Sequence, residues 1–124
     1  MSATLNSIRL AFEAGVPIVA GGDAGLTHFP QGSCTEEAAS YVELIGMTPQ
    51  QALQTLTINP ARLLGIADEV GTIDAGKRAD LLVLASDPLQ DVTVIQRPES
   101  RVLIMQAGVA VDRVSSLRAT VAKG

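Results

Sequence analysis

The spacing of apolar residues near the start of the chain predicts a helix followed by a strand. Leu5, Ile8 and Phe12 recur three and four residues apart and therefore share one face of a helix. Gly15 stands where a glycine commonly ends a helix, and residues 16–20 then form an apolar run before a Gly-Gly pair. Such a run is typical of a buried parallel strand. A helix, a glycine stop and a buried strand in this order favour an α/β fold.

Two more helices are expected in the middle of the chain. The first ends at Gly46, and its apolar face consists of Ala38, Tyr41, Val42 and Ile45. Residues 48–51, with the sequence Thr-Pro-Gln-Gln, predict a capping box at the start of the next helix. In such a box the Thr48 hydroxyl accepts from the Gln51 N–H, and the Gln51 side chain reaches back. The buried face of this helix is then Ala52, Leu53 and Leu56.

A short fourth helix is expected to follow. Its start is placed at Asn59-Pro60, because a proline disfavours helical conformation in the residue before it. Its end is placed after Leu64, with Gly65 as the stop.

Short β elements replace the helices in the second half of the chain. Residues 81–85 form a strongly apolar strand candidate, and Asp87 begins a turn. Residues 102–105 and 109–111 flank Gly108 and predict a hairpin. Neither half is closed by itself, because one parallel strand makes no sheet and so few β segments rarely stand alone. We therefore expect missing sequence or another chain to complete both halves, and the unpaired sheet edges favour self-association.

Composition excludes several classes of function. The 124 residues suffice for one small domain, and the net charge of −4 excludes a generic nucleic-acid binder and disfavours an anionic membrane surface. No apolar run approaches the roughly 20 residues of a membrane span. The start of the chain lacks the pattern of a signal peptide, and a single cysteine allows no intrachain disulfide. These features predict a soluble, cytoplasmic protein.

Asp23 is the strongest candidate for chemistry. It comes just after the predicted strand, at the carboxyl end where α/β folds place their ligands. The glycines around it allow a ligand to approach the backbone, and a carboxylate there can bind a metal or accept a proton from water. An aspartate that caps a helix or forms a turn explains the same position, so both interpretations stay open.

The other candidates have simpler explanations. His28, the only histidine, is a possible ligand, although a solvated histidine in a polar loop is the commoner case. Cys34 is expected to pack near a helix start rather than act as a nucleophile. Glu36 and Glu37 fit the first turn of a helix, where the dipole favours carboxylates. Asp74 and Lys77 flank a turn at Gly76, which indicates a structural role.

The supply of metal ligands is short. A catalytic zinc site normally takes three protein ligands and leaves one position open. Asp23 and His28 supply two at most, and no third candidate has a recognisable spacing. We therefore do not expect a self-contained metalloenzyme.

Several motifs together resemble one known family. Residues 15–25, with the sequence GVPIVAGGDAG, are similar to the last barrel strand of the amidohydrolase superfamily. Residues 46–65 resemble the helices that follow it, and residues 71–89 resemble the return into its small β domain. Residues 102–111 are similar to the closing hairpin of that domain. The resemblance runs from about residue 8 to residue 112 in the right order, and it points to the imidazolonepropionase- and prolidase-like group.

The resemblance implies a fold and a division of the chain. The fold is α/β: the C-terminal piece of a TIM-barrel amidohydrolase, with its last helix–strand–helix units, plus part of the small β-sandwich domain. Residues 1–66 would be the partial barrel, residues 67–112 the partial β domain and residues 113–124 a tail. The family's metal-binding histidines come from earlier strands that have no counterpart in this sequence.

The resemblance also implies a chemistry. Asp23 would ligate zinc or another divalent metal and take a proton from the attacking water, and His28 would be a substrate contact. Gly22 departs from the threonine or serine usual in the family. The implied reaction is hydrolysis of a C–N bond in a small amide, dipeptide or cyclic amide, carried out with the missing barrel segment or a second copy. The alternative is a non-catalytic fragment that associates with itself or a partner.

Overall fold

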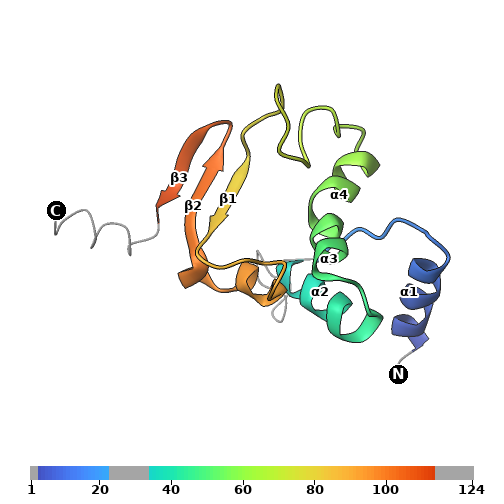
Figure 1. Ribbon diagram of the computed structural model, residues 1–124. Helices are drawn as coiled ribbons and strands as arrows, with labels where there is room; N and C mark the ends of the chain where they lie inside the picture. The colour runs from blue at the N-terminus through green and yellow to red at the C-terminus, as the bar shows by residue number, and fades with distance from the viewer. Residues whose placement is uncertain (1–2, 23–33, 114–124) are drawn as a thin grey trace.

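The computed structural model describes residues 3–22 and 34–113 as a cluster of helices beside a small antiparallel sheet (Figure 1). The α-helices are α1 (Ala3–Glu13), α2 (Cys34–Ser40), α3 (Pro49–Leu56) and α4 (Ile58–Leu63). The strands are β1 (Leu81–Leu84), β2 (Arg101–Gln106) and β3 (Val109–Arg113). The π-helical turn η1 (Tyr41–Ile45) continues α2, and the 3₁₀ turns η2 (Val92–Gln96) and η3 (Pro98–Ser100) precede β2. Within the described part of the chain, no helix is both long and apolar enough to cross a membrane.

The helix predicted to end at Gly46 is confirmed, with one change of geometry. It runs as α2 into η1 and stops at Gly46, whose φ of 86° lies in the left-handed region that favours glycine. The first predicted helix is confirmed as α1. The apolar spacing of each segment therefore predicted its helix correctly.

The capping box at the start of α3 is confirmed. The Gln51 N–H donates to the Thr48 hydroxyl oxygen at 3.2 Å, and the Thr48 N–H donates to the Gln51 side-chain oxygen at 2.9 Å. Two N–H groups that the first helical turn leaves without intrahelical partners are satisfied in this way.

The predicted start of the fourth helix was wrong by a residue or two. Helix α4 begins at Ile58, so Asn59 and Pro60 already lie within its first turn. A proline is tolerated there because the first N–H groups of a helix have no intrahelical partner. The predicted end is confirmed, since Leu64 caps the helix and Gly65 has a φ of 73°.

The strand predicted for residues 16–20 is wrong for the described structure. These residues form neither helix nor strand. A strand exists only where another strand supplies its hydrogen bonds, and no strand among residues 3–22 and 34–113 pairs with this segment. Its bonds go to helices instead, as the next subsection shows.

The predicted strand and hairpin are confirmed in the antiparallel sheet, which has the order β1-β2-β3. Leu81 pairs with Met105. The β2–β3 turn is Ala107-Gly108, with positive φ at both residues, as a two-residue hairpin turn requires. Hydrogen bonds from this turn reach back toward the start of β1: the Ala107 N–H donates to Asp80 Oδ1 at 2.7 Å.

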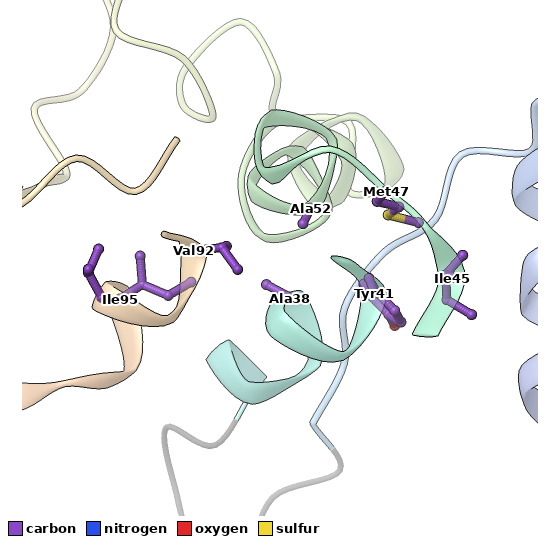
Figure 2. Close-up of a cluster of buried hydrophobic side chains, with 8 residues drawn as sticks. Ala38, Tyr41, Ile45, Met47, Ala52, Val92 and Ile95 are labelled. Atoms are coloured by element: carbon purple, nitrogen blue, oxygen red, sulfur yellow. The ribbon is translucent and has the colours of Figure 1, made fainter. Parts of the chain in front are cut away.

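The main core joins the helices to the segment before β2. Its buried members are Ala38, Tyr41, Ile45, Met47, Ala52, Val92, Val94 and Ile95 (Figure 2). Ala38 and Ala52 are fully buried, and their small side chains let α2 and α3 approach closely. Leu5, Ile8 and Phe12 of α1 pack against the cluster from outside. The predicted tail after residue 113 lies outside the described residues.

Candidate functional site

The best-defined part of the candidate site is the segment that leads to Asp23. Asp23 and His28 themselves lie outside the described residues, so their predicted roles stay predictions. Gly21 and Gly22 are described and come directly before Asp23. What the structure defines is therefore the approach to Asp23.

Three elements hold this segment by hydrogen bonds. Asn59 Nδ2 of α4 donates to the Ile18 carbonyl oxygen at 2.9 Å. The Ala20 N–H donates to the carbonyl oxygen of Thr55 in α3 at 3.0 Å. The Gly21 N–H donates to Glu37 Oε2 of α2 at 3.2 Å. The segment is thus tied at three points in four residues, although it belongs to no sheet in the described structure.

Glu37 has a second donor. The Tyr41 hydroxyl, one helical turn further along, donates to the same Oε2 at 2.9 Å. Burial, the hydrogen bond to Glu37 and the negative charge of Glu37 together raise the pKa of Tyr41 to about 12, with burial the largest cause. Tyr41 therefore stays protonated and donates throughout the physiological pH range.

A close contact explains the glycine at position 22. A Cβ atom placed on Gly22 would lie 3.2 Å from the backbone N, the Cα and the Cβ of Cys34. Such a contact is tighter than nine in ten real Cβ contacts, so the backbone of Cys34 would have to shift by a few tenths of an ångström. Cys34 is half-buried at the first position of α2, which confirms that it packs at a helix start. Gly22 thus lets residues 18–22 lie against the beginning of α2.

The remaining predicted candidates have structural roles. Lys77 Nζ donates to the Ala67 carbonyl oxygen and to the Thr72 hydroxyl, both at 2.6 Å, and lies 3.6 Å from an Asp74 carboxylate oxygen. The hydrogen bond from Thr72 holds the pKa of Asp74 below its ordinary value, and the charge of Lys77 acts in the same direction. Glu36 is exposed in the first turn of α2. These positions agree with the structural interpretation made from sequence.

Two of the open hollows on the described surface differ in chemistry. The larger, of about 530 Å³, is mainly apolar and lies between α3, the loop at residues 70–73 and β1. The smaller, of about 150 Å³, borders the anchored segment at Val16, Pro17 and Ile18 and reaches Asn59. Only the smaller hollow adjoins the approach to Asp23. The larger one carries just Arg78 and Asp80 as charged residues, so we do not assign catalysis to it.

Metal ligands do not gather in the described part of the molecule. Among residues 3–22 and 34–113, no three His, Cys, Asp or Glu side chains are placed so that they could hold a metal ion. Asp23 and His28, the metal-ligand candidates predicted from the sequence, lie outside these residues.

Sequence reasoning missed Glu37 and Asn59 as residues of this site. The spacing of Glu37 and Tyr41 by four residues signals that their side chains meet on one helix face. The bonds to Gly21 and Ile18 join positions 16 and 41 residues apart, and no local pattern reveals them.

Comparison with known proteins places this geometry in a family. The family model described as "Amidohydrolase family" matches residues 2–111. The imidazolonepropionase of Shouchella clausii is 29% identical over 125 residues, covering 92% of this chain and 27% of that protein. The structure of a candidate prolidase from Bifidobacterium longum is 33% identical with a TM-score of 0.80, covering 96% of this chain and 30% of that one. The Aspergillus niger ochratoxinase structure is 32% identical with a TM-score of 0.77, covering 88% and 25%.

Proposed function

This chain belongs to the amidohydrolase family, and we propose that it is the C-terminal part of a metal-dependent hydrolase of carbon–nitrogen bonds. The chain spans 27%, 30% and 25% of the three relatives compared above, which supports the proposal that the complete enzyme includes a larger part of a TIM barrel. The substrate class is a small amide, a dipeptide or a cyclic amide. The names imidazolonepropionase, prolidase and ochratoxinase among the relatives support a hydrolase of this kind.

One observation carries the proposal: the segment before Asp23 is anchored to three helices. The bonds to Asn59, Thr55 and Glu37 fix Ile18, Ala20 and Gly21. A catalytic side chain at Asp23 requires the backbone before it to be held firmly, because small displacements of a reacting group lower rates steeply. We assign Asp23 as a metal ligand and as the group that accepts a proton from water. His28 is assigned as a substrate contact.

The donor set fits a shared metal centre rather than one built by this chain alone. The sequence has one histidine, and the described residues hold no cluster of three ligands. We propose that Asp23 contributes one carboxylate ligand and that the remaining ligands come from the missing barrel segment. A divalent ion such as zinc, when bound, supplies the Lewis acidity that makes water a usable nucleophile near neutral pH.

The division of the chain follows the same proposal. Residues 1–66 complete the barrel, residues 67–112 belong to the small β domain and residues 113–124 form a tail. The absence of a basic excess argues against nucleic acid or anionic membranes as partners, and the single cysteine suits a cytoplasmic location. Association with a second copy is the other way in which the missing ligands are supplied.

Substitution of Asp23 tests the proposal. In the hydrolase assembly that contains this chain, Asp23→Ala should lower kcat by about 10²- to 10⁴-fold, because a general base and a metal ligand are lost together. Asp68→Ala, at an exposed aspartate in a turn of the described structure, is the matched control and should leave kcat unchanged. Full activity of the Asp23→Ala assembly would refute the assignment.

The sheet favours a second candidate function. Val109 and Val111 are 65% and 56% exposed on the edge strand β3, and such an edge can pair with another chain. In this alternative the chain is a non-catalytic module that associates with itself or a partner. Elemental analysis of the purified chain, together with its mass in solution, separates the two. The non-catalytic alternative would be favoured if the chain forms a stable oligomer without metal and stays inactive after the missing barrel segment is added.

A further inference from the structure

Glu37 is the point at which α2 meets the segment that ends at Asp23. A single carboxylate oxygen, Oε2, accepts hydrogen bonds from the Gly21 N–H at 3.2 Å and the Tyr41 hydroxyl at 2.9 Å. The two donors come from different parts of the chain and converge on one atom. Tyr41 is itself a buried member of the core, so its hydroxyl holds the carboxylate from a fixed position.

The contact lies close to Asp23 along the chain. Gly21 is two residues before Asp23 in the sequence. Neither the anchored residue Gly21 nor the single intervening residue Gly22 has a side chain. Glycines tolerate many backbone conformations, so the conformation of residues 21 and 22 depends on how well Gly21 is held.

We propose that Glu37 is a positioning residue, which fixes the Gly21 N–H and thereby sets where Asp23 enters the metal site. This inference rests on the proposed function of Asp23. Tyr41 orients the carboxylate, and Cys34 confines Gly22 from the other side through the close contact described above. Glu37 acts through a hydrogen bond to backbone and touches neither substrate nor metal in this role.

The proposal predicts which property of Glu37 matters. An amide oxygen has two lone pairs and can accept from both Gly21 and Tyr41, so Glu37→Gln keeps the contacts and removes the charge. Glu37→Ala removes both. Glu36→Ala changes the neighbouring carboxylate in the same helical turn, which is exposed and makes neither contact. Thr48→Ala, which removes the cap of α3 and makes no hydrogen bond to residues 18–22, serves as the reference for a purely structural change.

The first readout is amide hydrogen exchange at Gly21 in the 124-residue chain. Glu37→Ala should accelerate this exchange by about tenfold or more, since a hydrogen bond to a charged acceptor is lost. Glu37→Gln should stay within about threefold of the parent chain, and Glu36→Ala should leave the rate unchanged. Unchanged exchange in Glu37→Ala would overturn the inference.

The second readout is kcat in the metal-loaded hydrolase assembly. Glu37→Ala should lower kcat by about 10- to 100-fold with a small effect on KM, and Glu37→Gln should restore most of the rate. A loss no larger than that of Thr48→Ala, or a Gln variant as slow as the Ala variant, would overturn the positioning role. An inactive parent assembly would instead refute the proposed function of Asp23, while the exchange data would still decide whether Glu37 holds Gly21.

Discussion

Asn59 Nδ2 donates to the carbonyl oxygen of Ile18 at 2.9 Å, across 41 positions of sequence. The bond joins the first turn of α4 to the segment before Asp23, and the site is partly buried. A carbonyl oxygen in that position needs a partner, because an unpaired polar group removed from water is costly. Asn59 therefore belongs to the first turn of α4 and also binds the segment packed beside that helix.

Replacement of Asn59 should destabilise the fold. Asn59→Ala leaves the Ile18 oxygen without its donor and should lower the free energy of unfolding by about 1–2 kcal/mol. Asn59→Asp should lower the free energy of unfolding more, because a carboxylate oxygen would then face the Ile18 carbonyl oxygen and both are acceptors. Urea denaturation followed by circular dichroism measures both, with the exposed Gln50→Ala on α3 as a neutral amide control. An Asp variant as stable as the parent would contradict the assigned contact.

The capping box gives a second test of local structure. Thr48→Ala removes the hydroxyl that accepts from Gln51, and we expect a loss of about 1 kcal/mol in the free energy of unfolding. Thr48→Ser keeps an acceptor at the same position and should lose much less. The two urea midpoints measured side by side decide the matter, and equal destabilisation by Ser and Ala would argue against the cap.

Local signals account for what the sequence predicted correctly. The Thr48–Gln51 box, the stop at Gly46 and the hairpin turn before Val109 depend on residues a few positions apart. In each of these features the interacting groups lie within a few residues of one another, so the feature can be predicted without knowledge of the rest of the fold.

Contacts between distant residues account for what it missed. The strand expected for residues 16–20 needed a partner strand, and the described residues supply helices instead. Asn59 was interpreted only as a helix start, whereas its side chain is used 41 positions away. The role of Asp23 stays a prediction. The hydrogen bond from Gly21 to Glu37 depends on the packing of α2 against residues 18–22, which no local pattern predicts.

Two glycines with similar backbone angles should respond differently to alanine. Gly71 has a φ of 97°, and an added Cβ would lie 2.8 Å from the Ala61 Cβ and 3.1 Å from the Ile58 Cα. Gly76 has a φ of 87° with nothing within 4 Å. Gly76→Ala should therefore lose only about 1–2 kcal/mol from left-handed strain, and Gly71→Ala about 1–3 kcal/mol more from overpacking. Equal urea midpoints for the two variants would show that the loop does not pack on α4.

Tyr41 is the only tyrosine, so its ionisation can be followed directly by ultraviolet absorbance. Its pKa of about 12 exceeds the ordinary value of 10.0, because burial and the bond to Glu37 disfavour the phenolate. The folded-state pKa is raised, so the resulting stability is complete below pH 10 and is lost as the pH rises toward 12. In the native chain, Tyr41 should be less than half ionised at pH 11, with circular dichroism confirming that the fold persists.

Variants at Glu37 should separate the two causes of this raised pKa. Glu37→Ala should move the midpoint part of the way toward the ordinary value, because it removes the hydrogen bond and the charge but leaves the burial. Glu36→Ala should not move it. In Tyr41→Phe the stability should no longer depend on phenol ionisation, so its loss of stability between pH 10 and 12 should be shallower. A midpoint near 10 in the folded parent chain would mean that Tyr41 does not hold the Glu37 carboxylate, and the proposed support for Gly21 would lose one of its two contacts.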